Sequence, residues 1–255
     1  MKTALIQSNL IWENIEANLK SFDEKIRQVD SDTDLIILPE MFSTGFTMNP
    51  QKIAEPENGK AVSWMVKTAI QTNKALTGSL VIQENNKYYN RLFFVFPDGT
   101  YKTYNKRHLF SLAGEPQHYT AGQEKLVVTY KGRNVCLLIC YDLRFPVFSR
   151  NIEDYDLLIY VANWPKKRIQ AWDILLKARA IENMTYTIGV NRVGTDENQN
   201  EYTGHSQIID SLGNYLIEPQ QKEGVYTATL DIARQNELRN KLGFLKDRDD
   251  FILTT

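Results

Sequence analysis

Apolar and polar positions along this chain follow two periods, one typical of strands and one typical of helices. Short apolar runs such as 35–38 and 157–161 predict strands that are covered on both faces. Apolar residues three and four positions apart predict amphipathic helices, as over 13–29 and 169–183. In chain order, the pattern predicts strands over 4–8, 35–38, 76–83, 88–96, a stretch ending at 104, 125–130, 134–140, 157–161, 185–192, 206–210, 215–217 and 225–230, and helices over 13–29, 61–74 and 169–183.

Strands and helices alternate along the chain, which predicts an α/β domain. The 255 residues are ample for one large core, and no linker, low-complexity tract or short-period repeat divides them. We therefore predict a single domain over 1–255. Its last part, 231–255, is charged and aromatic, which is more typical of a surface arm than of a core element.

Composition and charge narrow the classes of function. An apolar content of 42% and a charged content of 24% are ordinary for a soluble globular protein, and a net charge of −1 does not point to nucleic acid or an anionic membrane as partner. No apolar run approaches the ~20 residues that span a bilayer, and the N-terminal stretch is too short and too polar for a signal peptide. Two cysteines provide no disulfide framework. We expect a cytoplasmic protein.

Three predicted strands end in residues that carry chemistry. Cys140 ends one buried run, Glu40 follows another, and Lys106 follows a third. A side chain at the carboxyl end of a buried strand is placed to meet a ligand at the edge of a sheet. Acyl transfer needs a thiol with a base beside it, a cation or N–H donor for the oxyanion, and a proton for the leaving nitrogen. The other cysteine, Cys136, lies on the same strand about 13 Å away, too far for a disulfide.

Each of these residues has a plainer interpretation when it is taken singly. A lone cysteine is more often a small buried hydrophobe. A glutamate after a strand is usually a solvated loop end or a helix cap, and Lys106 beside Arg107 is usually surface charge. The combination of all three at strand ends, with their particular neighbours, is what favours catalysis.

Other classes of enzyme find little support in the sequence. The three histidines, His108, His118 and His205, form no His-Glu-x-x-His pair, and the cysteines have no zinc spacing, so we expect neither a metal nor another cofactor. There is no Gly-x-Ser-x-Gly elbow and no Gly-rich phosphate loop. The basic run 166–168 is interpreted as a solvated face, with a lid or an anionic-substrate contact as the alternative.

The neighbours of the three residues resemble motifs of the nitrilase superfamily of carbon–nitrogen hydrolases. The resemblance covers nearly the whole chain, keeps the family's order of Glu, Lys and Cys, and is closest to small bacterial omega-amidases. The matching segments are Leu-Pro-Glu-Met-Phe at 38–42, Tyr-Asn-Lys-Arg-His-Leu-Phe at 104–110 and Cys-Tyr-Asp-Leu-Arg-Phe-Pro at 140–146, with further matches at 41–46, 160–165, 178–183 and 191–194.

The resemblance implies a role for each matching residue. Cys140 is expected to be the nucleophile and Glu40 the general base, which later protonates the departing ammonia. Lys106 and the backbone N–H of Tyr141 are expected to stabilise the tetrahedral intermediate. Glu115 matches the family's second glutamate and is expected beside the lysine. The intermediate would be a thioester.

The resemblance also implies a substrate class and the residues that bind it. Omega-amidases hydrolyse the side-chain amide of short 2-oxo acid amides such as 2-oxoglutaramate, which carry a carboxylate at the far end. Arg144 is expected to bind that carboxylate; the alternative is that it pairs with an internal acid, Asp142 or Glu182. Three aromatic residues are expected to form the pocket wall, with core packing as the alternative: Phe42, Phe46 and Trp164.

The fold and assembly implied by the resemblance go beyond the pattern itself. The family fold is a four-layer αββα sandwich, and its protomers pair as homodimers with the C-terminal arm, here 231–255, at the interface. Two other functions stay open on the sequence: a relative with different chemistry, such as an N-carbamoyl hydrolase, a nitrilase or an amidase for another acyl group, and a non-catalytic binding or scaffold protein with the same fold.

Overall fold

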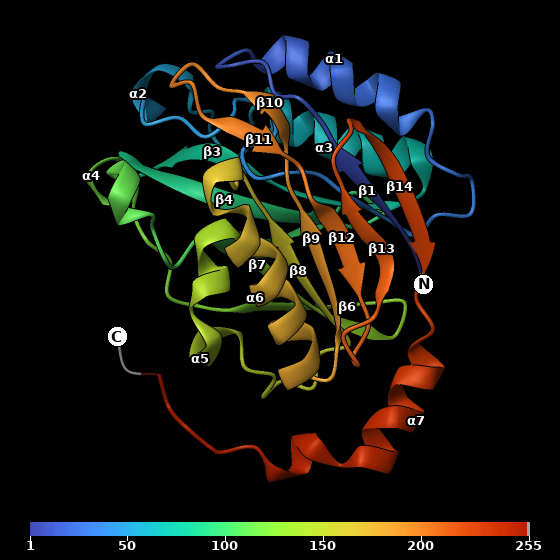
Figure 1. Cartoon of the computed structure of the whole chain (residues 1–255). Helices are drawn as coiled ribbons and strands as arrows, with labels where there is room; N and C mark the ends of the chain where they lie inside the picture. The colour runs from blue at the N-terminus through green and yellow to red at the C-terminus, as the bar shows by residue number, and fades with distance from the viewer. Residues whose placement is uncertain (254–255) are drawn as a thin grey trace.

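Two six-stranded sheets lie face to face in the computed structural model of the chain, with helices on their outer faces (Figure 1). The structure describes residues 1–253. The predicted α/β class and the four-layer αββα sandwich are confirmed. The first sheet has the strand order β14 (Gly224–Thr229), β1 (Lys2–Gln7), β2 (Leu35–Ile37), β3 (Ala75–Glu84), β4 (Lys87–Val95) and β5 (Tyr101–Asn105). The second has the order β13 (Tyr215–Gln220), β12 (Ser206–Ile209), β9 (Tyr186–Val190), β8 (Leu157–Val161), β7 (Arg133–Ile139) and β6 (Leu126–Tyr130).

Successive residues of a buried strand face opposite sides of the sheet, so one set packs between the two sheets and the other packs under the helices. In β2, Leu35 and Ile37 face the second sheet, whereas Ile36 packs against the helices on the outside. The strands in the middle of each sheet are parallel: β1 with β2 and β3, and β7 with β8 and β9. Because both faces of these strands are covered, β2, β8 and the buried part of β7 are continuously apolar rather than alternating.

The long helices cover the outer faces of the sheets. Helices α1 (Ile15–Ile26) and α3 (Lys60–Thr72) cover the first sheet, and α6 (Ile169–Glu182) covers the second (Figure 1). Helix α6 packs on β9 at Gly189, where a Cβ would lie 2.4 Å from a methyl carbon of Leu176. The absence of a side chain at this position is therefore what lets the helix approach the sheet.

Three elements differ from the sequence-based expectation. The segment 231–255, expected to be an arm, begins with the helix α7 (Ile232–Leu242), and its last two residues lie outside the described part. Asp231 caps this helix by accepting a hydrogen bond from a backbone N–H, and Ile232 and Gln235 are its buried residues. With so few apolar positions, the helix shows no apolar stripe in the sequence. The strands β10 (Val193–Thr195) and β11 (Glu201–Thr203) form a hairpin that was not predicted either.

The remaining elements are short. They are the α-helices α2 (Pro50–Ile53), α4 (Glu115–His118) and α5 (Pro146–Ser149) and the 3₁₀ helices η1 (Ser111–Ala113), η2 (Cys140–Arg144), η3 (Lys166–Arg168) and η4 (Phe244–Asp247). Within residues 1–253, no helix is both long enough and apolar enough to cross a membrane.

Candidate active site

The carboxyl ends of β2, β5 and β7 bring the three predicted residues together at one edge of the sandwich. Glu40 and Lys106 follow strands of the first sheet, and Cys140 follows a strand of the second. The sequence predicted Cys140 as the last residue of its strand, but β7 ends at Ile139 and the cysteine begins η2. Its φ is 44°, which a non-glycine residue seldom adopts. This sharp turn directs the thiol away from the strand.

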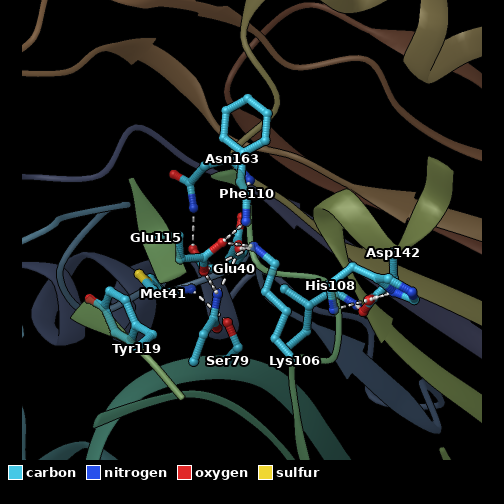
Figure 2. Close-up of polar contacts among 12 residues, drawn as sticks. Glu40, Met41, Ser79, Lys106, His108, Phe110, Glu115, Tyr119, Asp142 and Asn163 are labelled. Atoms are coloured by element: carbon cyan, nitrogen blue, oxygen red, sulfur yellow. Dashed lines mark hydrogen bonds and ion pairs between the residues drawn. The ribbon is translucent and has the colours of Figure 1, made fainter. Parts of the chain in front are cut away.

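The turn at Cys140 is held by the buried carboxylate of Asp142. One oxygen, Oδ2, accepts hydrogen bonds from the backbone N–H of Ile139 at 2.9 Å and from the Tyr104 hydroxyl at 2.8 Å. The other oxygen, Oδ1, lies 2.8 Å from Nδ1 of His108 and also accepts from its backbone N–H (Figure 2). Since Tyr104 belongs to β5, one carboxylate ties the turn of the second sheet to the strand that precedes the lysine.

Lys106 lies between two carboxylates in the interior. Its Nζ is 2.9 Å from Oε1 of Glu40 and 3.0 Å from Oε2 of Glu115, and all three side chains have an exposed fraction of 0% (Figure 2). An ammonium group in this position is rigid, because both neighbours and the surrounding packing fix it. The structure thus places Glu115 beside the lysine, where the resemblance put it.

Two asparagines complete the hydrogen bonding of Glu40, and the sequence analysis assigned neither a role. Asn90 Nδ2 donates to Glu40 Oε1 at 2.7 Å, and the backbone N–H of Asn163 donates to Oε2 at 2.8 Å. The side-chain amide of Asn163 also donates to the backbone carbonyl of Glu40 at 2.6 Å. On the other acid, the N–H of Phe110 donates to Glu115 Oε2 at 2.5 Å. The available signal was a polar residue within the buried apolar stretch of β4, at Asn90.

Burial and the neighbouring charges set the protonation states. Burial lowers the pKa of Lys106, but the carboxylates of Glu115 and Glu40 more than offset this, so that its pKa is raised and the side chain is an ammonium. Burial raises the pKa of Cys140 well above its usual value, and the charge of Glu40 raises it further, while Lys106 lowers it. The resting cysteine is therefore a thiol, and the buried carboxylate of Glu40, whose charge acts on it, is the candidate proton acceptor. Burial also raises the pKa of Glu115.

A cavity of about 460 Å³ opens onto this cluster. Cys140 and Lys106 lie on its wall, together with the predicted residues Tyr141, Phe46 and Trp164. The Lys106 ammonium lies 5.2 Å from the centre of the Phe46 ring, a cation–π distance. The cavity has the size of a site for a small molecule.

Phe42 is not part of this wall, and its prediction as a pocket residue is wrong. The ring is fully buried and packs against Phe22 at 5.4 Å and Trp64 at 5.7 Å between ring centres. The preceding residue, Met41, has a φ of 44°, which sharply turns the chain after Glu40. Phe42 therefore packs in the core between the first sheet and its helices.

Arg144 lines the cavity, and the alternative that it pairs with an internal acid is contradicted. Asp142 is occupied by the bonds described above, and Glu182 pairs with Arg179 at 2.9 Å. The Arg144 guanidinium lies 5.0 Å from the centre of the Trp164 ring, and among residues 1–253 it forms no salt bridge. The structure thus leaves its charge available at the cavity.

The basic run 166–168 agrees in part with its first interpretation as a solvated face, because Lys166 and Lys167 are exposed whereas Arg168 is half-buried. Lys167 and Arg168 line the cavity, whereas Lys166 pairs with Glu201 at its exposed side. For metals, no group of three or more His, Cys, Asp or Glu side chains in the described part of the chain is arranged to hold an ion.

Replacing Lys106 by methionine should destabilise the fold in a pH-dependent way. The change leaves Glu40 and Glu115 buried without their cation, and breaking such a pair costs about 3–5 kcal/mol. Because burial raises the pKa of Glu115, the folded variant binds protons more tightly than the unfolded chain, so its stability falls as the pH rises above the unfolded value of about 4.3. We expect the loss in Tm relative to the wild type to be larger at about pH 8 than at about pH 5. An equal loss at both pH values would contradict this.

Comparisons with known proteins agree with this geometry. A family model described as carbon–nitrogen hydrolase matches residues 2–240. The chain is 42% identical to "Omega-amidase YafV" of Yersinia enterocolitica over 99% of this chain and 98% of that protein. It is 32% identical to "2-oxoglutaramate amidase" of Bacillus subtilis over 95% of both proteins. Among solved structures, the CN-hydrolase superfamily protein XC1258 of Xanthomonas campestris, with an arsenic adduct in its active site, superposes with a TM-score of 0.97 at 39% identity and covers 100% of this chain and 99% of that one.

Proposed function

The chain belongs to the carbon–nitrogen hydrolase family, and from that premise we propose that it is an omega-amidase. It hydrolyses carbon–nitrogen bonds other than peptide bonds. Its substrates are short 2-oxo acid amides such as 2-oxoglutaramate and 2-oxosuccinamate, which it converts to the 2-oxo dicarboxylate and ammonia. The observation that carries the proposal is a cavity that holds both Cys140, beside its buried carboxylates, and the unpaired cation of Arg144.

The first half of the proposed reaction transfers the acyl group to the enzyme. The sulfur of Cys140 attacks the amide carbon while Glu40 takes the thiol proton. The oxyanion is stabilised by the Lys106 ammonium and the backbone N–H of Tyr141, and Glu115 holds the ammonium in place. Glu40 then gives its proton to the leaving nitrogen as the C–N bond breaks. Ammonia leaves, and a thioester remains on the cysteine.

The second half returns the enzyme to its starting state. A water molecule loses a proton to Glu40 and attacks the thioester carbon. The tetrahedral intermediate is stabilised again by Lys106, and its collapse breaks the C–S bond. Glu40 returns the proton to the sulfur of Cys140, and the 2-oxo dicarboxylate leaves. Each cycle therefore consumes one water and releases one ammonia.

Substrate selection in this proposal depends on the other residues that line the cavity. Arg144 binds the far carboxylate, for which its planar fork is suited. Phe46 and Trp164 limit the width of the cavity. No cofactor takes part.

The direct test is ammonia release from 2-oxoglutaramate and 2-oxosuccinamate, compared by kcat/KM with a panel of neutral amides, N-carbamoyl compounds and nitriles. We expect the two 2-oxo acid amides to be the best substrates. A higher kcat/KM for a ureide or a nitrile would move the protein to another branch of the family. A cytoplasmic location stays a prediction from the sequence.

We also propose that the protein is a homodimer that uses the segment 231–253. Figure 1 shows α7 and the segment after it running beside the body of the sandwich. Several large apolar residues are exposed, including Phe244 at 57% and Ile252 at 91%, and Ile174 on α6 at 67%. A partner protomer that covers these side chains would remove their apolar surface from water.

We expect light scattering to give twice the protomer mass of 29.5 kDa. Removing residues 243–255 should weaken the dimer, because this deletes Phe244 and Ile252. A protomer mass for the intact chain over a range of concentrations would contradict the proposal.

A further inference from the structure

Two arginines of the cavity wall are held in the same way. The Arg144 guanidinium lies 5.0 Å from the ring centre of Trp164, and the Arg168 guanidinium lies 5.0 Å from the ring centre of Phe110. Both side chains line the cavity that contains Cys140. An aromatic face orients a planar guanidinium group and leaves its N–H donors free at the edges.

The backbone connects the two arginines. The indole N–H of Trp164, the ring beneath Arg144, donates a hydrogen bond of 2.9 Å to the backbone carbonyl of Arg168. Arg168 directly precedes the first residue of α6, a helix of 14 residues with no acidic residue in its first turn. The positive end of the helix therefore adds to the charge at this wall.

Neither arginine has an acidic partner among residues 1–253, because the nearby acids are otherwise engaged. Glu201 pairs with Lys166 at 2.7 Å. Asp196 also lines the cavity, but it accepts the Tyr202 hydroxyl at 2.8 Å and the backbone and side-chain N–H groups of Asn200.

The positive charges of Arg144 and Arg168 are therefore not neutralised by a salt bridge among residues 1–253. Both guanidinium groups line the same cavity. Burial lowers the pKa of Arg168, the charge of Cys140 raises it, and the positive charge of Arg144 lowers it. A wall with two neighbouring cations, neither of which forms a salt bridge among residues 1–253, attracts an anion. In a cavity that also contains the nucleophile, that anion is part of the substrate.

We propose that Arg168 is a second recognition residue, and that Arg144 and Arg168 together bind the carboxylate and the adjacent 2-oxo oxygen of the substrate. This assignment rests on the proposed function and deepens it, because it names the part of the substrate that the wall recognises. Two guanidinium forks provide donors for two carboxylate oxygens and a neighbouring carbonyl. The pair selects monoamides of 2-oxo dicarboxylic acids over neutral amides of equal length.

The test compares three single substitutions on a charged and a neutral amide. Arg168→Met and Arg144→Met each remove one cation of the pair. Lys20→Met is the control, because it removes the same charge from an exposed residue of α1 that forms no salt bridge among residues 1–253 and does not line the cavity. The substrates are 2-oxoglutaramate and pentanamide, which have the same five-carbon chain.

For Arg168→Met, we expect kcat/KM for 2-oxoglutaramate to fall on the order of 30-fold, mainly through KM, with pentanamide unaffected. Arg144→Met should behave alike, and Lys20→Met should match the wild type on both substrates. Unchanged kcat/KM for 2-oxoglutaramate in Arg168→Met would overturn the inference and leave the proposed function standing. An equal loss on both amides would show a structural role instead.

A binding measurement separates the inference from the proposed function. In a Cys140→Ala background, calorimetric titration with 2-oxoglutarate should give a Kd that Arg168→Met raises by a similar factor. If the wild type hydrolyses no amide while this binding still depends on Arg168, the proposed function fails and the anion site stands. Binding that is unaffected by Arg168→Met overturns the inference whatever the turnover.

Discussion

Replacing Cys140 by alanine should abolish ammonia release from 2-oxoglutaramate and leave the fold intact. Without the sulfur no thioester forms, and removing a catalytic nucleophile typically lowers kcat on the order of 10⁶-fold. The substitution removes one atom at the cavity wall and disturbs none of the bonds of Asp142 that hold the turn. Circular dichroism and Tm should therefore stay close to those of the wild type. Mass spectrometry of the wild type with substrate should detect an acyl adduct that the variant lacks.

Cys136 provides the matched control for this experiment. It is the other cysteine, lies within β7 and is fully buried, with a pKa raised by burial. We expect Cys136→Ala to retain kcat, at some cost in stability from the lost packing. A thiol-selective alkylating agent should label the folded wild type once, at Cys140. Full turnover by Cys140→Ala would remove the cysteine mechanism, and a Cys140 that resists alkylation would favour a non-catalytic binding protein.

Replacing Glu40 by glutamine should have the second largest effect. We expect kcat to fall by about 10²–10⁴-fold, because the amide group is no base and provides no proton for ammonia. The surroundings also reject an NH₂ group: one oxygen accepts from Lys106 and Asn90, and the other from the backbone N–H of Asn163. Either orientation of the amide faces donors, so the variant should lose Tm as well. Glu40→Asp keeps the charge and should retain Tm better than Glu40→Gln.

The same variant separates the charge of Glu40 from its role as base. The negative charge of Glu40 is one cause of the raised pKa of Cys140. Its removal should lower that pKa, so that thiolate absorbance in the ultraviolet develops at a lower pH than in the wild type. Amide hydrolysis should fall nevertheless. A thiolate transition at higher pH, or hydrolysis near the wild-type rate, would contradict the assignment of Glu40.

The sequence predicted the ends of β2, β5 and β7 to within one residue, and the buried strands β2 and β7 have a clear apolar pattern. Glu40 and Cys140 follow parallel strands of different sheets, and Lys106 follows β5, which pairs antiparallel with β4. Their meeting at one edge therefore depends on how the two sheets stack, which the sequence pattern does not give. The helix α7 was not predicted, because a helix with few buried residues has no apolar stripe to detect.

The residues that line the cavity were harder to predict than the catalytic residues Glu40, Lys106 and Cys140. A turn at Met41 decides whether Phe42 faces the cavity or the core, and a residue of that type seldom adopts a positive φ. The partner of Arg144 depended on the bonds of Asp142, which come from segments distant in the sequence. Contacts between segments that are distant in the sequence leave no periodic pattern of apolar and polar residues.

The two halves of the site belong to different sheets. The base and the ammonium follow strands of the first sheet, and the thiol follows a strand of the second. The apolar layer between the sheets, which includes Phe94 and Leu137, therefore sets the distance between the Cys140 sulfur and the Glu40 carboxylate. A change in side-chain volume in this layer would alter the spacing of sulfur and carboxylate without touching either. Selection for turnover thus extends to packing residues that never meet the substrate.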